Sequence, residues 1–438
     1  MTTEQVHAQI LETVEAHRDQ IIEFVQDLVR IPSVNYPPHG DELACQRLVE
    51  GFMRNMALDV DIFKPDAIPG ITEHPGWMRG HDYADRPNVV GVRQGAGGGR
   101  SLLLLAHVDV VPEGPHELWR YGPFTPKVEK DELIGRGSND DKGGLAALLM
   151  ALRCVEAAGY RTAGNVILAS VVDEESGAGN GTLATLLRGH IADGAVYCDG
   201  LNLEIHVANL GGGHCLVDLQ LRPEVSTSRG IERIVEILSI MYQDICLFGQ
   251  DRARLFQTDP RYRNTQWPEI AVRAAMLSAG TSDGSNSGNA RIQFSFYILP
   301  GEDPAMIQAE VATRIRSLAN RYDSVLLPPR IQWPGRLMPP SAIAADHPFV
   351  DMVAAAYAAA TQRAARRSGS PMSDLFQFNL FSPRPMPTVA MGPGRWGDSG
   401  AAHEPNESVL IDGHLIPFVK TLALLIVDWC GCVPATSP

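Results

Sequence analysis

Histidines and carboxylates follow apolar stretches of this chain at short distances. His107 and Asp109 come directly after the run Leu102–Ala106, whose length is typical of a strand buried on both faces. A Gly-rich turn and Asp140 then precede an apolar helical run that begins at Leu145. Imidazole nitrogen and carboxylate oxygen suit zinc, and manganese or cobalt less tightly. The first hypothesis is therefore a metal-dependent hydrolase.

Further candidates follow other apolar runs. The carboxyl ends of strands in an open α/β sheet are where binding sites form, so residues that follow such runs are expected to converge. One histidine or one glutamate pair is more often structural, but several at equivalent strand ends are hard to attribute to chance. The candidates after the runs 102–106, 165–172, 195–197 and 388–391, or on the helix-entry turn, are His107, Asp109, Asp140, Glu174, Glu175, Asp199 and His403.

Strands and helices alternate around these residues, which indicates an α/β fold with a mostly parallel, doubly wound sheet. A segment rich in Pro, Gly and aromatic residues, 66–87, is interpreted as a surface loop. Apolar residues at helical or alternating spacing predict the other elements. The predicted helices are 4–31, 41–56, 145–156 and 349–365, and the further predicted strands are 59–63 and 88–92.

The middle of the chain has a different pattern. At 438 residues the chain is too long for one ordinary core. Alternating runs at 215–221 and 290–298 and helical runs at 229–241 and 304–322 predict an inserted α+β domain. The expected organisation is a catalytic domain made of residues 1–208 and 336–438, interrupted by the inserted domain, residues 209–335.

Composition restricts the partners. The net charge of −14 argues against nucleic acid or an anionic membrane surface. The longest C-terminal apolar run, 422–427, is far shorter than the ~20 residues that span a bilayer. Seven scattered cysteines suit reduced thiols, and the first twenty residues show no secretory pattern. We expect a soluble, cytoplasmic protein with a small-molecule substrate.

Four motifs make the prediction specific. They are HVDVVP at 107–112, GRGSNDDKGG at 135–144, DEESGAGNGT at 173–182, and GPG…AHEPNE at 392–407. Together they resemble the two-metal peptidase and deacylase family of acetylornithine deacetylase, succinyl-diaminopimelate desuccinylase, aminoacylase, carnosinase-type dipeptidases and carboxypeptidase G. The resemblance covers nearly the whole catalytic portion and is weak across the inserted segment. It implies two divalent ions, zinc first with manganese or cobalt as alternatives, and a homodimer in which the inserted domain serves as lid and dimerisation domain.

The resemblance also implies the ligands of each ion. His107 and Asp199 would hold one metal, and Glu175 and His403 the other. Asp140 would bridge both, which sets the distance between them. Asp141 follows Asp140 directly and could compete for the bridging role, but the family register favours Asp140.

Two further residues receive catalytic roles from the resemblance. Glu174 would be the general base, which takes a proton from the shared water and passes it to the leaving amine. Asp109 would accept a hydrogen bond from the second ring nitrogen of His107 and so fix its tautomer. A cis peptide bond is expected after Asp140, and a local salt bridge is expected for Lys142.

Two family features are missing. The stretch 223–234 contains no histidine where relatives carry one that stabilises the oxyanion. Tyr297 stands where relatives tend to carry an arginine, and only arginine clamps a carboxylate bidentately. An aspartate at the position of Asp199 is commoner among aminopeptidases and dipeptidases of the family, whereas the segment 86–144 looks more like deacylases. These two cues disagree about the substrate.

Three hypotheses about function remain. The leading one is hydrolysis of an amide C–N bond in an N-acyl amino acid or a dipeptide. An alternative, motivated by the missing histidine and arginine, is a hydrolytic deaminase that acts on an atypical substrate such as an aromatic amine. The third is a non-catalytic binding protein of the same fold, against which the complete set of ligands and the base argue.

Overall fold

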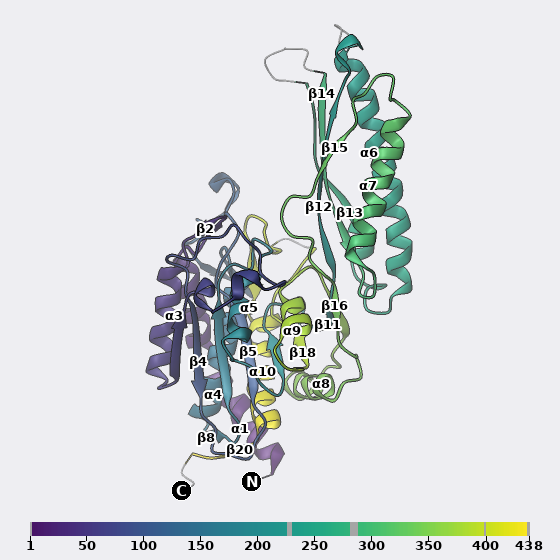
Figure 1. The fold of residues 1–438 in the computed structure, drawn as a ribbon. Coiled ribbons are helices and arrows are strands. Elements are labelled where there is room, and N and C mark those ends of the chain that lie inside the picture. The colour runs from purple at the N-terminus through teal and green to yellow at the C-terminus, as the bar shows by residue number, and fades with distance from the viewer. Residues whose placement is uncertain (1, 226–229, 281–287, 398–399, 436–438) are drawn as a thin grey trace. The chain divides into compact units, whose positions relative to one another are not determined.

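The computed structural model describes residues 2–225, 230–280, 288–397 and 400–435 (Figure 1). The chain divides into two compact units: unit 1 is residues 1–208 with 342–438, and unit 2 is residues 209–341. Unit 2 extends beyond the predicted end of the insert at residue 335, because Met338 pairs with Gly212 through two backbone hydrogen bonds.

In the described part of unit 1, a nine-stranded sheet carries the fold. Its four central strands, β18, β10, β5 and β9, are parallel to one another. The flanking strands β11, β4 and β3 are antiparallel, so the predicted α/β sheet is confirmed with its parallel strands at the centre. In sheet order the strands are β16 (Ser341–Ala342), β11 (Ile205–Asn209), β18 (Thr388–Ala390), β10 (Ala195–Tyr197), β5 (Leu102–His107), β9 (Val166–Val171), β4 (Asn88–Arg93) and β3 (Asp59–Phe63), with β17 (Arg367–Ser370) paired to β11.

Helices cover both faces of this sheet, as expected for a doubly wound fold. Successive side chains of a strand point to opposite faces. Leu102 and Leu104 accordingly join one core and Leu103 and Leu105 the other. The first core is covered by α1 (Thr3–Ala16), α2 (Arg18–Arg30), α3 (Leu43–Asn55), α4 (Lys142–Ala157), α8 (Pro348–Thr361) and α10 (Ile416–Cys430), and the second by α5 (Asn180–Leu187) and α9 (Leu375–Phe381).

The segment Ile411–Cys430 is the one described helical stretch that is long and apolar enough to cross a membrane. Its main part, α10, packs against α8, α4 and α1. Leu424 and Ile426 are fully buried in the first core. The apolar composition therefore reflects a core position.

Small sheets hold the loops near the ends of the main strands. β7 (Glu132–Ile134) pairs with both β6 (Lys127–Glu129) and β19 (Ser408–Leu410). Because β7 precedes the turn 135–140 and β19 follows the motif at 403–407, this pairing brings the two motifs together. The other two-stranded pairs are β1 (Asn35–Tyr36) with β2 (His39–Gly40), and β8 (Tyr160–Thr162) with β20 (Cys432–Pro434).

Unit 2 is an α+β unit with a core of its own, as the pattern of the inserted segment predicts. Its described strands form an antiparallel sheet in the order β13-β14-β12-β15, and α6 and α7 pack on one face of it (Figure 1). Along β14, alternate side chains such as Ile292 and Phe294 are buried. The elements are β12 (Gly211–Gln220), α6 (Gly230–Thr258), β13 (Val272–Ala279), β14 (Asn289–Ile298), α7 (Pro304–Asn320) and β15 (Arg330–Gln332).

Candidate metal centre

Three parallel strands end at the same edge of the main sheet and deliver most of the candidates. His107 is the last residue of β5, the pair Glu174-Glu175 follows β9, and Asp199 follows β10. The register places His107 beside Val171, which fixes the relative height of the first two loops. Asp140 reaches the same place from the turn before α4.

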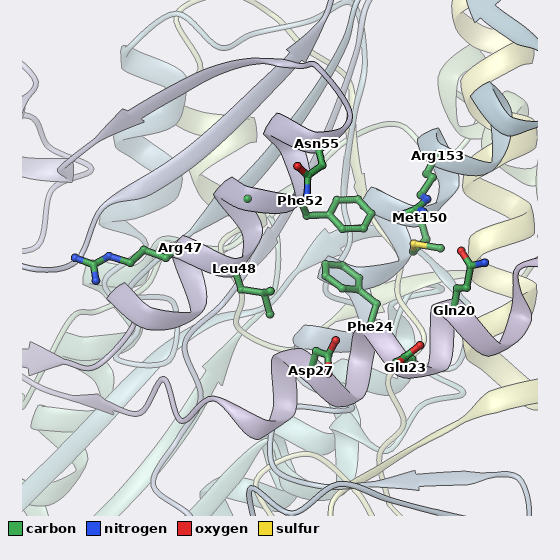
Figure 2. Close-up of a pocket in the computed structure, with 11 residues that line it drawn as sticks. Gln20, Glu23, Phe24, Asp27, Arg47, Leu48, Phe52, Asn55, Met150 and Arg153 are labelled. Carbon is green, nitrogen blue, oxygen red and sulfur yellow. The ribbon is translucent and has the colours of Figure 1, made fainter.

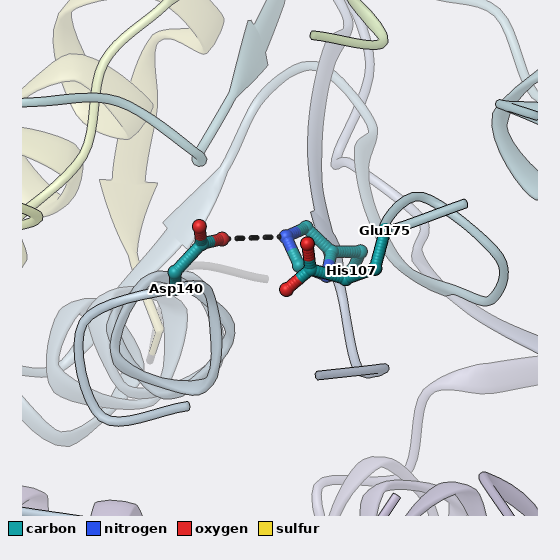
Figure 3. Close-up of side chains that lie close together, drawn as sticks. All are labelled: His107, Asp140 and Glu175. Atoms are coloured by element: carbon teal, nitrogen blue, oxygen red, sulfur yellow. Dashed lines mark hydrogen bonds and ion pairs between the residues drawn. The ribbon is translucent and has the colours of Figure 1, made fainter. Parts of the chain in front are cut away.

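Asp140 lies between the two candidate histidines. Its Oδ1 is 2.9 Å from Nε2 of His107, and its Oδ2 is 3.3 Å from Nε2 of His403. Nε2 of His403 is also 3.0 Å from Oε2 of Glu175. Ligand atoms of His107, Asp140 and Glu175 all lie within 4.8 Å of one another (Figure 3). One carboxylate with an imidazole at each oxygen is the arrangement that a bridging ligand requires.

Asp199 is linked to this cluster through its electrostatics. Burial, followed by the negative charge of Asp140, raises the pKa of Asp199 to about 7. The structure thus joins His107, Asp140, Glu175 and His403 by direct contacts, and Asp199 by charge.

Buried acids dominate the site. Burial raises the pKa of Glu174 well above its usual value and also raises that of Glu175. The charge of Glu175 raises the pKa of His403, and the neighbouring acids Asp109 and Asp140 raise that of His107 even though its burial opposes this. Such a group of acids is stabilised by positive charge, whether from protons or from metal cations.

The residues present fit a pair of divalent cations. Oε1 of Glu175 is buried and has no hydrogen-bond partner within the described ranges. A buried polar atom left in this way costs free energy unless a ligand or water completes it. The donor set of two imidazoles and three carboxylates is one that zinc, manganese and cobalt all accept.

The contact between Asp109 and His107 differs from the expectation. Nδ1 of His107 lies 2.9 Å from the backbone oxygen of Asp109, whereas the carboxylate Oδ1 is 3.6 Å away. Because a carbonyl oxygen can only accept, it keeps the proton on Nδ1 and leaves Nε2 available to a metal. The Asp109 carboxylate accepts instead from the backbone N–H groups of Glu174 and Glu175, at 3.2 and 3.1 Å.

The residues after Asp140 include one expected and one unexpected feature. The peptide bond between Asp140 and Asp141 is cis, as the resemblance implies. Among the described residues, Lys142 has no carboxylate partner that would make the predicted local salt bridge. Its buried Nζ donates to the carbonyl oxygens of Leu28 and Ile31 at the end of α2, at 3.0 and 2.7 Å. The C-terminal carbonyls of a helix carry partial negative charge and attract this group, although burial lowers the pKa of Lys142.

Glu407 holds the turn that carries Asp140, and its role was not predicted. Its Oε1 accepts from the backbone N–H groups of Gly137, Asn139 and Asp140, at 2.9, 3.0 and 3.0 Å. Its Oε2 accepts from Nη1 of Arg136. The only sequence signal for Glu407 was its place at the end of the motif GPG…AHEPNE, 392–407. Residues 398–399 of that stretch lie outside the described residues.

The segment interpreted as a surface loop also supplies buried residues. The side chains of His81, Tyr83 and Arg86 are buried, and each contacts Asp173, the residue before Glu174. No periodicity marks these three residues in the sequence. The position of the missing family histidine, 223–234, is only partly visible, because residues 226–229 lie outside the described residues.

A hollow of about 500 Å³ lies elsewhere in unit 1, between α2, α3 and α4 (Figure 2). The rings of Phe24 and Phe52 stack there with centroids 4.4 Å apart, and Arg153 lies over Phe52. None of its lining residues belongs to the candidate metal centre.

Comparisons with known proteins agree with this geometry. N-formyl-4-amino-5-aminomethyl-2-methylpyrimidine deformylase from Bacillus subtilis is 25% identical over 448 residues, which cover 95% of this chain and 96% of the relative. Human carnosine dipeptidase 1 has a similar fold, with a TM-score of 0.71 at 15% identity over 97% of this chain and 99% of the other. A dinuclear metal-binding M20 peptidase from Bacillus subtilis gives a TM-score of 0.57 at 14% identity, over 95% and 99%.

The model of peptidase family M20/M25/M40 matches residues 103–428. This match includes every candidate residue from His107 to His403, and it confirms the resemblance that the four motifs indicate. The chain therefore belongs to peptidase family M20/M25/M40, and it is a hydrolase that acts on C–N bonds.

Proposed function

We propose that this chain hydrolyses the amide bond of a small N-acyl amine through two metal ions held by His107, Asp140, Glu175, Asp199 and His403. The observation that carries the proposal is the position of Asp140, whose two oxygens face the two imidazoles. A carboxylate in this position can serve both ions at once.

The protein groups divide the work between holding the ions and moving a proton. His107 and Asp199 would hold one ion and Glu175 and His403 the other. When bound, the pair supplies an activated water and polarises the scissile carbonyl. Glu174 would take a proton from the attacking water and deliver it to the leaving nitrogen. Its burial favours this role, because a carboxylate with a raised pKa holds a proton more readily.

Two observations favour an N-acyl amine over a dipeptide. The full-length relative from Bacillus subtilis is a deformylase. Tyr297 replaces the arginine that would clamp a substrate carboxylate, and its ring meets Trp267 edge-on with centroids 6.4 Å apart. A substrate that lacks a carboxylate, such as an acylated aromatic amine, suits this replacement.

The test combines metal removal with a substrate panel. The purified chain is treated with a chelator, then reconstituted with zinc, manganese or cobalt, and assayed on N-formyl and N-acetyl amines, N-acyl amino acids and dipeptides. We expect activity to disappear and return with the metal, with the highest kcat/KM on amines without a carboxylate. Activity that survives complete metal removal contradicts the two-metal mechanism, and a preference for dipeptides contradicts the substrate class.

We infer that zinc is the native ion, since imidazole and carboxylate donors both suit it. Metal analysis of protein purified without added metal tests this inference, and two zinc ions per chain are expected. We also place the protein in the cytoplasm, because all seven cysteines are free thiols in the structure. Fractionation of the source cells tests the location.

We further infer that unit 2 mediates a homodimer. Among its described strands, β13 is the outer strand of the sheet beside α6, and it exposes Met276 and Leu277. The neighbouring helix α6 exposes Val235 and Tyr242. An open edge with adjacent apolar side chains is a surface that pairs readily with a second copy. Leu277→Lys should shift the dimer towards monomer in sedimentation, and an unchanged mass would contradict this interface.

A further inference from the structure

Two buried acids, Asp109 and Asp173, adjoin the glutamate pair 174–175, and the side chain of Asn35 joins these two acids. Nδ2 of Asn35 donates to Oδ2 of Asp109 at 2.8 Å and to Oδ1 of Asp173 at 3.2 Å. Asn35 is 3% exposed and both acids are fully buried. Because this neutral amide donates to both carboxylates, it fixes their positions relative to each other without adding a charge.

Each of these acids controls the backbone of the glutamate pair. Asp109 accepts from the N–H groups of both Glu174 and Glu175. Asp173 directly precedes the pair and has φ of 69°, in the left-handed region. That conformation is uncommon for a residue with a side chain, so other contacts must maintain it.

The contacts of Asp173 come from the segment 81–86 and from its own turn. Its carboxylate accepts from Nη2 of Arg86 at 3.2 Å, from Oγ of Ser176 at 2.8 Å and from the hydroxyl of Tyr83. Arg86 is anchored in turn by a two-armed pair with Glu42. Asp173 is therefore held firmly, and Asn35 transmits that position to Asp109.

We propose that Asn35 is a positioning residue, which links Asp109 to Asp173 and so fixes the turn that presents Glu174 to the water and Glu175 to the metal. This inference rests on the proposed function for the role of Glu174. It goes beyond that function by assigning a determinant of geometry that lies outside the metal ligands and the base. Removal of the Asn35 amide frees Asp109 from Asp173, and the N–H groups of the glutamate pair then lose a fixed acceptor.

The test compares Asn35→Leu with Asn35→Ser and with the matched control Gln46→Leu. Leucine has a similar volume but no donor, whereas serine offers one donor in place of two. Gln46 is 1% exposed and donates to the backbone oxygen of Ser170 at 3.0 Å, so its replacement also removes a buried amide. The readouts are metal titration with zinc, kcat and KM on the best substrate, and Tm.

We expect Asn35→Leu to weaken the binding of one of the two zinc ions about 10- to 100-fold, as loss of an outer partner of a ligand commonly does. At saturating zinc its kcat should fall at least about tenfold with KM nearly unchanged, and Asn35→Ser should be intermediate. Gln46→Leu should match Asn35→Leu in loss of Tm while it keeps zinc binding and kcat within about threefold of the wild type.

Equal effects of Asn35→Leu and Gln46→Leu on zinc binding and kcat would overturn the proposal, because they would show a general loss of stability. If Asn35→Leu does not fold, Asn35→Ser against Gln46→Leu gives the same comparison. A wild-type chain that binds two zinc ions but hydrolyses no member of the panel would overturn the proposed function alone, since zinc titration still tests Asn35.

Discussion

Glu174 and Glu175 are adjacent residues with different surroundings. Glu175 reaches Nε2 of His403 at 3.0 Å, a contact typical of two ligands that share an ion. The pKa of Glu174 is raised chiefly by burial, and the charges that affect this pKa most are those of His107, which lowers it, and Asp374, which raises it. These surroundings support the proposed division, in which Glu175 is a metal ligand and Glu174 is the general base.

Replacement of the base should separate metal binding from turnover. Glu174→Gln keeps the shape of the side chain but cannot accept a proton, so kcat should fall roughly 10²- to 10⁴-fold while two metal ions stay bound. The control Glu175→Gln should instead lose metal affinity, because it removes a ligand. Metal content and kcat measured on the same preparations check this, and a kcat in Glu174→Gln close to that of the wild type would remove Glu174 from its role.

His206 predicts a dependence of stability on pH. Burial lowers its pKa to about 4, below the 6.5 of an unfolded histidine, so the native state binds this proton less readily than the unfolded state. The contribution of neutral His206 to the free energy of unfolding is complete above pH 6.5 and is lost as the pH falls from 6.5 towards 4. The geometry agrees, because Nε2 of His206 accepts from the N–H of Leu201 at 3.1 Å and must be unprotonated to do so.

A variant that cannot titrate isolates this effect. His206→Gln offers an acceptor oxygen but no proton site. When the pH falls from 7.5 to 5, its free energy of unfolding should therefore decrease by about 2 kcal/mol less than that of the wild type. Urea unfolding at the two pH values measures the difference. Equal losses in the two proteins would assign the acid sensitivity to other groups.

At the scale of elements, the turn 135–140 depends on one carboxylate. Three backbone N–H groups converge on Oε1 of Glu407, and Arg136 occupies the other oxygen. An amide in place of this carboxylate must turn its NH₂ group towards one of these donors, and the buried clash should displace Asp140.

Glu407→Gln should therefore weaken the binding of both metal ions, by about tenfold, because Asp140 is the proposed shared ligand. Glu132→Gln is the matched control: Glu132, in β7, accepts from Nη2 of Arg395 at 2.7 Å, whereas the described N–H groups of the turn donate to Glu407. Zinc titration of both variants decides the matter. If Glu132→Gln weakens zinc binding to the same extent, then the small sheet that contains β7, and not the Glu407 carboxylate, holds Asp140 in place.

The strands and the ligands that follow them could be predicted because their signals are local. β5 and β9 are mostly apolar runs, and the candidates stand at or shortly after their ends: His107 is the last residue of β5, and Glu174-Glu175 follow β9. The break between α1 and α2 at His17 could not be predicted, because the apolar spacing continues across it. α6 runs on to Thr258, well beyond residue 241, and the buried Ile245 and Phe248 continue its helical spacing.

The buried polar residues could not be predicted, because their partners are distant in sequence. Tyr83 meets Asp173 across ninety positions, and Lys142 meets Ile31 across 111. In a loop without periodicity, a tyrosine or an arginine is compatible with a solvent-exposed position until the fold supplies a partner. The same reasoning applies to Asn35, whose two acceptors come from different strand ends.

At the scale of the whole molecule, the insertion leaves and returns through neighbouring strands. β11 ends at Asn209, β16 begins at Ser341, and the two strands are adjacent in the main sheet. The hydroxyl of Ser341 donates to the side chain of Asn209. Each unit also has a separate hydrophobic core. The main sheet can therefore close without unit 2 if the two strand ends are joined.

Excision of unit 2 should leave a folded metal-binding protein. All five proposed ligands lie in unit 1, so residues 1–208 joined to 342–438 by a short Gly-Ser linker should bind two zinc ions with affinities within about tenfold of the full chain. Circular dichroism and zinc titration check fold and binding. Hydrolysis should be lost if unit 2 supplies a group to the reaction, and full retention of kcat would instead confine the whole mechanism to unit 1. A folded product that binds no zinc would show that the ligands converge only in the presence of unit 2, against the geometry that Asp140, His107 and His403 form within unit 1.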